Sequence, residues 1–287
     1  MHKVLITGAN GQLGRAFAAS LDGNEAFAVR VCGHEALDIS NELAIRHELS
    51  TFGADILINC AAYTAVDAAE EQAELADTAN NQAVATIAKA CHSLSVKLIH
   101  FSTDYIFDGK KKQPYIETDT PRPLNIYGRT KLAGEIAAHD ICPDALIIRT
   151  SGVYAPWGHN FVRTIYARLL ANEPSKVVAD QVMSTTEAST LADAVKHIIL
   201  SGKNASGIFN YANTGAASWY DFAVEIARIA RLDEGLISPV KTSEYPTKAA
   251  RPQYSVLDTT LIQQTFGIKI PEWKTALTHT ISKITIG

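Results

Sequence analysis

The sequence predicts an α/β protein built on a doubly wound parallel sheet, with a smaller, partly interleaved lobe of α+β type. Three observations predict this fold class. An apolar run at residues 3–7 leads directly into a glycine-rich turn and a helical pattern. Short apolar runs and helical stretches then alternate as far as residue 150, as in a parallel sheet covered by helices. Beyond that point the pattern loosens. We therefore expect residues 1–150 to form one domain, and residues 151–287 mainly a second lobe with segments returning to the first.

Length and composition set the broad class. Of the 287 residues, 47% are hydrophobic and 20% are charged, as in soluble globular proteins. The net charge is −4 and the densest basic run is Lys110–Lys112, so nucleic acid is not an expected partner. No apolar run approaches the ~20 residues of a membrane span, and we expect no membrane association. Isolated cysteines without CxxC spacing indicate free thiols and a cytoplasmic protein. These cysteines are Cys32, Cys60, Cys91 and Cys142.

The first turn carries a dinucleotide-binding fingerprint. Gly8, Gly11 and Gly14 lie between the first expected strand and a helix. Glycines there permit a tight turn, close approach of the backbone to a pyrophosphate and close helix packing, and the helix N-terminus offers free N–H groups to phosphates. The context predicts a Rossmann-type domain that binds NADPH or NADH. The expected cofactor contacts in this turn are Gly8, Asn10, Gly11, Gln12, Leu13 and Gly14.

The adenosine end of the cofactor is expected beyond the second strand, residues 28–32. Glu35 could bind the adenosine ribose, whereas Arg15 could meet a 2′-phosphate, so NADH and NADPH both remain open. Asp38 could act as the N-terminal cap of the helix expected at residues 41–50. After the third strand, residues 56–60, small side chains let a flat ring or a ribose approach the backbone. Ala61, Ala62 and Tyr63 are the expected contacts there.

The remaining elements follow from hydrophobic periodicity. Strands are expected at residues 97–101, 145–149 and 207–211. Helices are expected at residues 75–94, 127–139, 160–170, 190–200, 219–230 (capped by Ser218) and 273–284. Because the carboxyl ends of parallel strands meet at one edge of a sheet, the site is expected at that edge.

A tyrosine and a lysine four residues apart mark the expected catalytic helix. Tyr127 and Lys131 would share one face of the helix. A phenol has a reference pKa of about 10, and a nearby ammonium lowers it. Tyr127 is therefore a candidate general acid, with Lys131 to tune its pKa. An ordinary surface tyrosine and lysine is the alternative for an isolated pair, but the dinucleotide fingerprint favours the catalytic interpretation.

A hydroxyl at the end of the fourth strand completes the candidate catalytic set. Thr103 lies at the rim of the sheet, where it could donate a hydrogen bond to a substrate oxygen. The structural alternative is a turn that the Thr103 hydroxyl closes. The catalytic role is favoured because Tyr127 and Lys131 follow at the spacing that a hydroxyl, tyrosine and lysine triad uses.

Taken together, these residues resemble the extended short-chain dehydrogenase/reductases and, within them, the dTDP-4-dehydrorhamnose reductase family. The resemblance covers nearly the whole chain. The segments that carry it are 8–14, 60–67, 102–107, 125–131, 149–151, 160–161, 218–219 and 250–252. It implies reduction of the 4-keto group of dTDP-6-deoxy-L-lyxo-4-hexulose to dTDP-L-rhamnose, a precursor of cell-surface polysaccharides.

The resemblance also implies the role of each site residue. Tyr127 would protonate the C4 oxygen while the nicotinamide delivers hydride to C4, and Lys131 would also hold the nicotinamide ribose. Thr103 would polarise the keto oxygen. Asp38 and Ile39 would flank the adenine. The residues expected to contact the nucleotide-sugar are Thr103, Asp104, Tyr105, Asn160, Trp219 and Arg251.

The chain departs from the family pattern at three places. Gly152 stands where the family usually has tryptophan, and residues 180–186 lack the usual glycine and proline. The glutamates that hold Mg²⁺ between subunits in some members fall near Ala16 and Ser189, so no metal is expected and the chain is a monomer or a homodimer. The first two changes leave open a different nucleotide-linked 4-keto-6-deoxyhexose as substrate.

Two further alternatives come from relatives of this family. Sugar-nucleotide dehydratases place an acidic residue directly after Thr-Asp, where this chain has Tyr105. The regulatory subunit of methionine adenosyltransferase resembles the family but is a binding partner. A non-catalytic, cofactor-binding subunit of that kind would not need Thr103, Tyr127 and Lys131, and this chain has all three.

Overall fold

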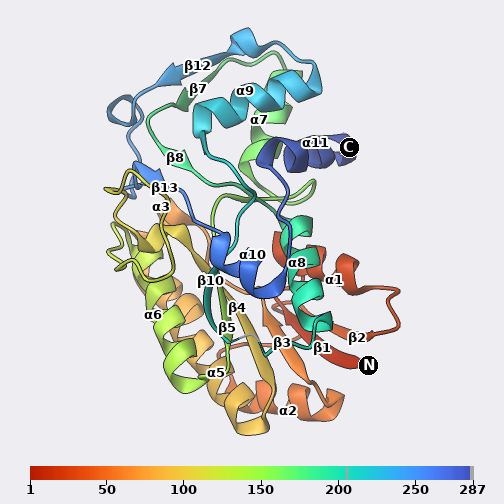
Figure 1. Cartoon of the computed structure of the whole chain (residues 1–287). Helices are drawn as coiled ribbons and strands as arrows, with labels where there is room; N and C mark the ends of the chain where they lie inside the picture. The colour runs from red at the N-terminus through yellow and green to blue at the C-terminus, as the bar shows by residue number, and fades with distance from the viewer. Residues whose placement is uncertain (205, 285–287) are drawn as a thin grey trace.

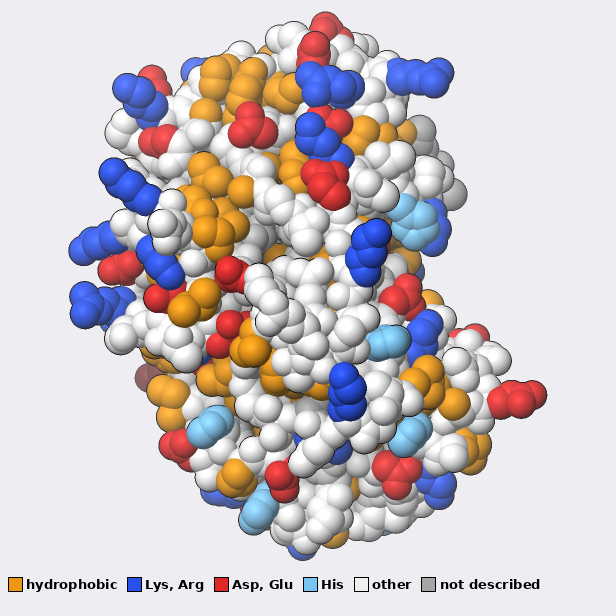
Figure 2. All heavy atoms as spheres, viewed as in Figure 1, with side chains coloured by type: hydrophobic (Ala, Val, Ile, Leu, Met, Phe, Trp, Pro, Cys, Tyr) orange, Lys and Arg blue, Asp and Glu red, His pale blue; other side chains and the backbone are white. Residues whose placement is uncertain are grey.

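The protein has two lobes stacked along its long axis (Figure 1). The computed structural model describes residues 1–204 and 206–284. Residue 205 and residues 285–287, the end of the expected second lobe, lie outside the described residues. Figure 2 shows acidic and basic side chains interspersed over one face of the molecule. No helix in the described ranges combines the length and the apolar character that a membrane crossing requires.

The larger lobe is built on a six-stranded sheet in which all the strands are parallel, which confirms the expected fold class. Its order is β10-β5-β4-β3-β1-β2, so the connections reverse direction between β1 and β3. Each strand lies close to its expected range. The strands are β1 (His2–Thr7), β2 (Phe27–Cys32), β3 (Ile56–Asn59), β4 (Lys97–Thr103), β5 (Leu146–Thr150) and β10 (Gly207–Asn210).

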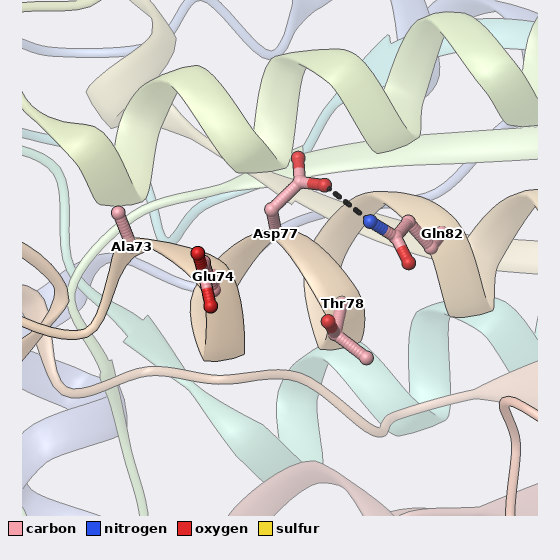
Figure 3. A pocket seen from close by; sticks show the side chains of 5 residues that line it. All are labelled: Ala73, Glu74, Asp77, Thr78 and Gln82. Atoms are coloured by element: carbon pink, nitrogen blue, oxygen red, sulfur yellow. Dashed lines mark hydrogen bonds between the residues drawn. The ribbon is translucent and has the colours of Figure 1, made fainter.

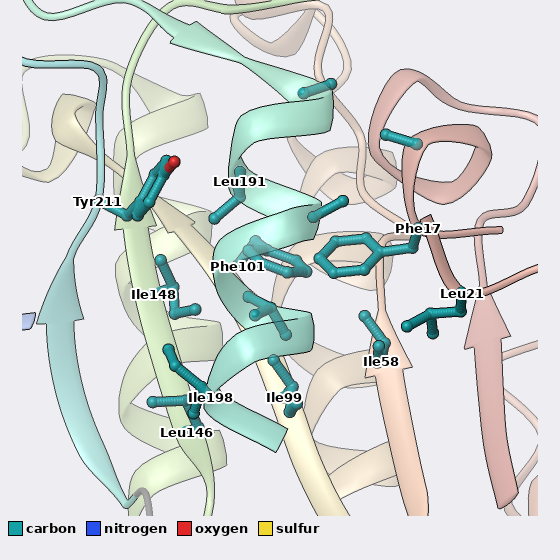
Figure 4. Packing of buried hydrophobic residues seen from close by; sticks show 14 of the residues in the cluster. Phe17, Leu21, Ile58, Ile99, Phe101, Leu146, Ile148, Leu191, Ile198 and Tyr211 are labelled. Atoms are coloured by element: carbon teal, nitrogen blue, oxygen red, sulfur yellow. The ribbon is translucent and has the colours of Figure 1, made fainter. Parts of the chain in front are cut away.

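One face of the sheet packs on α1 (Gln12–Leu21), α8 (Ala188–Leu200) and α10 (Thr260–Phe266). Strand residues at alternate positions meet apolar side chains of these helices (Figure 4). The rings of Phe17 on α1 and Phe101 on β4, for example, lie 5.4 Å apart. Burial of each such side chain stabilises the fold by roughly 1.5–3 kcal/mol. Helix α1 comes from the first half of the chain, whereas α8 and α10 come from the second, so both halves share this core.

The other face packs on α2 (Glu42–Phe52), α5 (Ala83–Leu94) and α6 (Ile126–Ile141). A single helix expected at residues 75–94 is instead α4 (Ala73–Asp77), a π-helical segment η1 (Thr78–Gln82) and α5. Within η1, the Asn80 side chain accepts from the N–H of Tyr63 and donates to its carbonyl, at 2.9 and 3.0 Å. A π-helical insertion of this kind often marks a functional site. Helix α3 (Val66–Ala69) precedes it.

The smaller lobe packs three helices against short paired strands. The helices are α7 (Phe161–Leu170), α9 (Trp219–Ala230) and α11 (Trp273–Lys283). Ser218 caps α9 as expected, in a reciprocal capping box with Asp221. The short strands are β7 (Ser175–Val178) with β12 (Ile237–Val240), β8 (Val182–Met183) with β11 (Ala217–Ser218) and β13 (Tyr254–Ser255), and β6 (Val153–Tyr154) with β9 (Thr186–Glu187). The remaining turns are η2 (Asp104–Ile106), η3 (Glu234–Leu236) and η4 (Thr242–Glu244).

Candidate active site

A pocket of about 590 Å³ lies where the connections of the sheet reverse direction. Its walls are the segments that follow β1, β2 and β3, together with η1 and the start of α5. Ligands of doubly wound sheets bind at this place, outside the carboxyl ends of the strands. The pocket is lined by Gly8, Asn10, Gly11, Gly33, His34, Leu37, Asp38, Ile39, Ser40, Cys60, Ala61, Ala62, Thr78, Ala79 and Ala83.

Most, but not all, of the expected cofactor residues line this pocket. The expected cofactor contacts that do not line it are Gln12, Leu13, Gly14, Tyr63, Tyr127 and Lys131. The Gln12 side chain accepts from Asn160 instead, and Leu13 packs against the apolar core. The backbone of Tyr63 is held by Asn80, and its phenol donates to Gln72 at 2.9 Å. Thr78 and Ala79 also line the pocket but were not predicted, because residues 75–94 were expected to form one regular helix.

The shape of the glycine turn fits a dinucleotide. Gly8 has φ +65°, and a Cβ there would lie 2.6 Å from the backbone of Cys60 and Ala61. A Cβ on Gly14 would collide with the Gly8 carbonyl. Gly11 caps α1 without a side-chain hydrogen bond, which leaves the first N–H groups of the helix for a ligand. Free N–H groups at the positive end of a helix dipole are the donors that a pyrophosphate needs.

The adenosine end of the pocket is lined by His34 and Asp38. Asp38 accepts from the N–H and the hydroxyl of Ser40, at 2.9 and 2.7 Å. The cap of α2 is Asn41, so the alternative reading of Asp38 as a helix cap is wrong. Glu35 does not line the pocket, and the guanidinium of Arg15 stacks on the ring of Trp157, 5.0 Å from its centroid.

Helix α6 carries Tyr127 to the carboxyl end of β4. Asn125 caps the helix by accepting from Gly128 N–H at 2.7 Å, and Glu70 accepts from Ile126 N–H at 2.8 Å. The first turn of α6 packs closely on η2, where a Cβ on Gly128 would collide with the carbonyl of Tyr105. The rings of Tyr105 and Tyr127 meet edge to face, with centroids 5.9 Å apart.

The environment of Tyr127 keeps its phenol protonated. Burial raises the pKa of Tyr127 to about 12, the Thr103 hydroxyl lowers it, and the carboxyl of Asp104 raises it. Thr103 also accepts from Tyr105 N–H at 3.2 Å and so caps η2. The Thr103 hydroxyl therefore closes a turn and faces Tyr127 at the same time. The structural role and the catalytic role considered from the sequence are thus compatible.

Lys131 lies one turn beyond Tyr127 and is fully buried. Its ammonium donates to the carbonyl of Phe101 at 2.6 Å. Burial lowers the pKa of Lys131 to about 8, while the Glu135 carboxylate raises it. No effect of Lys131 on the pKa of Tyr127 is assigned in this structure, where the ammonium is directed at β4, so the expected tuning of Tyr127 by Lys131 stays a prediction.

Asp104 is a buried carboxyl beside Thr103 and Tyr127. Thr103 donates to it at 3.1 Å, the Ser151 hydroxyl lies 2.7 Å away, and Ser255 also bonds to it. Burial raises the pKa of Asp104 to about 6, and these hydroxyls oppose the rise. The sequence did not predict this cluster, since Ser151 and Ser255 lie far from Asp104 along the chain.

Arg251, from the C-terminal part of the chain, lies beside Tyr105 in the same cluster. It makes two hydrogen bonds to Asp67, at 3.1 and 2.6 Å, and also bonds to the phenol of Tyr105. The hydrogen bonds from Arg251 and Ala249 hold the pKa of Asp67 below its usual range, against its partial burial. The structure thus gathers Thr103, Asp104, Tyr105, Tyr127 and Arg251 around one point.

Two expected substrate residues lie elsewhere. Asn160 caps α7 by accepting from Arg163 N–H at 3.0 Å, and its amide donates to Gln12 and Ala155 at 2.9 Å. Both polar ends of its side chain are thus engaged within the protein. Trp219 starts α9 and packs on Phe161, with ring centroids 4.7 Å apart. It belongs to the apolar core of the smaller lobe.

The two family departures around residue 152 touch each other. Gly152 has φ +52°, and a Cβ there would lie 3.0 Å from the Ser184 carbonyl and 3.3 Å from the Met183 sulfur. The nearest atoms around Gly152 thus belong to the altered segment 182–186 and not to an aromatic side chain. The two departures from the family pattern are therefore in contact with each other in the fold.

A second hollow of about 530 Å³ lies on the outside of α4 and η1 (Figure 3). Among its lining residues, Asp77 accepts hydrogen bonds from Gln82 at 2.9 Å and from Asn81 at 3.0 Å. None of the expected site residues lines it. Within residues 1–204 and 206–284, no group of three or more His, Cys, Asp or Glu side chains is placed to hold a metal ion.

The fold and the site define a dinucleotide-dependent oxidoreductase of the short-chain dehydrogenase/reductase type. The family described as RmlD substrate binding domain matches residues 1–286, and the chain belongs to it. The dTDP-4-dehydrorhamnose reductase of Burkholderia thailandensis is 38% identical over 96% of this chain and 96% of its own. These findings confirm the resemblance inferred from the sequence.

Solved structures show the same similarity. A dTDP-4-dehydrorhamnose reductase from Clostridium acetobutylicum has a TM-score of 0.93 at 40% identity, covering 98% of both chains. The Bacillus anthracis enzyme in complex with NADP has a TM-score of 0.94 at 34% identity, covering 98% of this chain and 99% of that one. A relative from Streptomyces niveus, 36% identical over 96% of this chain and 95% of its own, is named dTDP-4-keto-6-deoxy-D-glucose reductase.

Proposed function

We propose that this protein reduces the 4-keto group of dTDP-6-deoxy-L-lyxo-4-hexulose to dTDP-L-rhamnose, with NADPH or NADH as the reductant. The observation that carries the proposal is the constellation of Thr103, Tyr127 and Lys131. It lies at the carboxyl end of β4, on the same edge of the sheet as the dinucleotide-shaped pocket. Relatives that match over nearly the whole chain are dTDP-4-dehydrorhamnose reductases, which supports the same substrate.

The glycine turn and the start of α1 would hold the pyrophosphate, and the segment 33–40 would hold the adenosine. The reduced nicotinamide, when bound, supplies hydride for the keto carbon. The Lys131 ammonium would bind the nicotinamide ribose hydroxyls near the end of β4. His34, at the adenosine end, offers an N–H donor that suits a ribose hydroxyl or a 2′-phosphate equally.

Tyr127 would give its proton to the C4 oxygen. A phenol with a pKa of about 12 stays protonated at neutral pH, so the proton is present when negative charge develops on that oxygen. Thr103 donates to Asp104 in this structure and would turn its hydroxyl to the keto oxygen. A second donor to that oxygen would stabilise the negative charge that develops on it.

Arg251 and Tyr105 would contact the nucleotide-sugar. Arg251 would bind the diphosphate of that ligand. A guanidinium suits phosphate oxygens because its N–H groups form a planar fork. The bond to Asp67 already fixes this fork in place. Asn160, which bonds to Gln12 beside the glycine turn, and Trp219, which packs on Phe161, would shape the outer wall of the sugar site rather than touch its reacting atoms.

The proposal is tested by mixing the purified protein with the 4-keto sugar nucleotide and following NADPH oxidation against dTDP-L-rhamnose formation. One NADPH is expected per product. Tyr127→Phe should lower kcat by about 10²–10⁴-fold and leave NADPH affinity intact, because general acid catalysis contributes on that order. Tyr245→Phe, an exposed tyrosine, is the matched control. A Tyr127→Phe protein with normal turnover would remove the proposed proton donor.

A different 4-keto-6-deoxyhexose is the second candidate substrate. The replacement of a tryptophan by Gly152, whose nearest neighbours are Met183, Ser184 and Thr185 of the altered segment, favours it, and the Streptomyces niveus relative is named for a different sugar. A panel of dTDP-4-keto-6-deoxy sugars separates the two candidates by the ratio of their kcat/KM values. A non-catalytic regulatory subunit would instead bind NADPH tightly and turn over none of the panel.

We also propose that the protein acts in the cytoplasm as a monomer or homodimer. All four cysteines are free, and Cys32, Cys91 and Cys142 are buried, which suits a reducing compartment. Sedimentation of the purified protein distinguishes the monomer from the homodimer.

A further inference from the structure

A row of three buried polar side chains crosses the central sheet next to the glycine turn. Thr7 on β1, Asn59 on β3 and His100 on β4 are register partners on adjacent strands, and each is only 1% exposed. The Thr7 hydroxyl oxygen lies 2.7 Å from Asn59 Oδ1, and Asn59 Nδ2 lies 3.1 Å from His100 Nδ1. The row thus links the strand that enters the glycine turn to the strand that ends in Thr103.

This row determines which ring nitrogen of His100 carries the proton. Asn59 accepts through Oδ1 from the backbone N–H of Ala61 at 3.2 Å. Because an N–H can only donate, the atom that it meets is the amide oxygen, and the atom that faces His100 is the amide nitrogen. That nitrogen is a donor, so His100 Nδ1 accepts and the ring proton is on Nε2. A second proton, on Nδ1, would place two donors against each other.

The groups around His100 also favour a neutral ring. Burial and the Lys131 ammonium lower the pKa of His100 well below its usual range. Glu135 on α6 and Arg149 on β5, two further charged groups on this face of the sheet, bond to each other at 2.6 Å. Helix α5 contributes apolar side chains to this face, among them Val84, Ile87 and Ala88.

Two buried polar atoms of β4 lack a protein partner within residues 1–204 and 206–284. They are His100 Nε2 and Ser102 Oγ. Side chains two apart on a strand point to the same face, and Leu98, two residues before His100, packs in the core under α2, α5 and α6. Buried polar groups without a protein partner commonly bind an ordered water, which typically makes about three hydrogen bonds to such groups.

Lys131 brings a third polar group to the same strand. Its ammonium donates at 2.6 Å to the carbonyl of Phe101, the residue between His100 and Ser102. An ammonium has three donors. The carbonyl takes one and the proposed contact with the nicotinamide ribose takes another, which leaves one for a water bound against β4.

We propose that His100 Nε2, Ser102 Oγ and the Lys131 ammonium bind one buried water molecule, which holds the lysine side chain against β4. The water accepts from His100 and Lys131 and donates to Ser102, so its own donors and acceptors are used. His100 and Ser102 are then positioning residues that act through Lys131. The benefit of a fixed Lys131 for cofactor binding rests on the proposed reductase function, whereas the water and the ring proton do not.

NMR of the histidine ring nitrogens in the full-length protein tests the first step. His100, assigned by the absence of its signals in His100→Gln, should show a protonated Nε2 and an unprotonated Nδ1 at every pH from about 5 to 8, the range in which an ordinary imidazole gains its second proton. A His100 ring that becomes doubly protonated in this range, or that carries its proton on Nδ1, would overturn the proposal.

A crystal structure of the wild-type protein at a resolution that shows ordered waters tests the second step. One water is expected within hydrogen-bond distance of His100 Nε2, Ser102 Oγ and Lys131 Nζ. A map that shows other buried waters and none at this position would contradict the proposal, whatever the activity of the protein.

Fluorescence titration with NADPH tests the positioning role. His100→Leu should raise the Kd for NADPH by about 3–10-fold, the equivalent of roughly one hydrogen bond, whereas His100→Gln, which keeps an N–H at the position of Nε2, should bind nearly as well as wild type. Thr280→Val is the control, because it removes another buried hydroxyl that lacks a partner among the described residues, on α11.

If His100→Leu does not fold, Ser102→Ala removes a different partner of the water with a smaller change, and the same rise in Kd is expected. Wild-type affinity for NADPH in a folded His100→Leu or Ser102→Ala protein would disprove the positioning role. A wild-type protein that contains the water and binds NADPH, but reduces no 4-keto sugar, would contradict only the proposed function.

Discussion

At the scale of single residues, Asp104 is a buried carboxyl whose hydrogen bonds only partly offset its burial. It is 3% exposed and lies among three hydroxyls, two of which, those of Thr103 and Ser151, also bond to other groups. Ser151 has one proton, yet its oxygen lies 2.7 Å from Asp104 and 2.9 Å from the carbonyl of Ser184. Ionised Asp104 therefore lacks a full set of donors, which agrees with its raised pKa.

Asp104→Asn should remove a pH dependence of stability. The folded state, with a pKa of about 6, binds a proton more tightly than the unfolded chain, with a pKa near 4. The free energy of unfolding of wild type should thus fall by on the order of 3 kcal/mol as pH rises from about 4 to 6, and stay lower above it. Urea unfolding across this range measures it. An identical pH slope in Asp104→Asn and wild type would show that Asp104 is not the group that titrates.

Gly152→Ala should destabilise the protein through backbone strain and crowding. At φ +52° a Cβ costs roughly 1–2 kcal/mol, and contact with Ser184 and Met183 adds to it. Gly23→Ala is the matched control, because Gly23 has φ +69° with nothing within 4 Å of a Cβ. Thermal or urea unfolding should show a larger loss at position 152 than at 23. Equal losses would mean that Met183 and Ser184 do not confine this position.

At the scale of elements, the contact between α6 and η2 sets the catalytic geometry. Gly128→Ala should force the two elements apart, because the new Cβ collides with the Tyr105 carbonyl. We expect a loss of about 1–3 kcal/mol in stability from overpacking. A fall in kcat larger than any change in cofactor affinity should accompany it, since Tyr127 moves with the helix.

Ile136→Ala, on the exposed side of the same helix, is the control and should change neither quantity much. Fluorescence titration with NADPH and steady-state kinetics give the two numbers. If Gly128→Ala kept wild-type kcat, the close approach of α6 to η2 would have no part in catalysis.

The elements show how far the sequence could predict the fold. Buried parallel strands such as β3 and β4 were predicted because they are short, apolar and bounded by turns. The π-helical η1 was missed because it lies within a continuous helical stretch and contains no proline or glycine that would mark an interruption. The two-residue strands β8 and β13 have no periodicity to detect, and their pairing joins distant parts of the chain.

The site was predictable where local spacing carries the chemistry. Tyr127 and Lys131 lie on one helix, and Thr103 ends a strand, so the sequence places all three. Arg149 and Glu135 meet only because β5 packs beside α6, which spacing along the chain does not reveal. The raised pKa of the Tyr127 phenol could not be predicted either, because it depends on how deeply the side chain is buried.

At the scale of the whole molecule, residues 248–251, in the C-terminal part of the chain, are hydrogen-bonded to the larger lobe. Lys248 pairs with Glu71 at 2.6 Å, Ala249 N–H donates to Asp67 at 3.0 Å, and the Ala250 carbonyl accepts from Asn125 at 2.8 Å. Arg251 completes the set with its two bonds to Asp67. The segment thus lies beside the first turn of α6 and delivers Arg251 to Tyr105.

Arg251→Ala should separate binding from stability. The partner Asp67 is 43% exposed, and such pairs contribute about 1 kcal/mol or less. The free energy of unfolding should therefore change little. The KM for the nucleotide-sugar should rise by about tenfold or more, because a charge-assisted contact to a phosphate is worth about 1.5–3 kcal/mol. Lys248→Ala, in the same segment, is the control. An unchanged KM in Arg251→Ala would exclude Arg251 as a substrate ligand.

The central claim is that hydride passes to C4 of a keto sugar at this site. Incubation with NADPH deuterated at the transferable position of the nicotinamide, followed by NMR of the isolated sugar nucleotide, tests it most directly. The account predicts one deuterium, bonded to C4 of dTDP-L-rhamnose, for each NADPH oxidised. Product without deuterium at C4, or release of water from dTDP-glucose with no net consumption of NADPH, would contradict it.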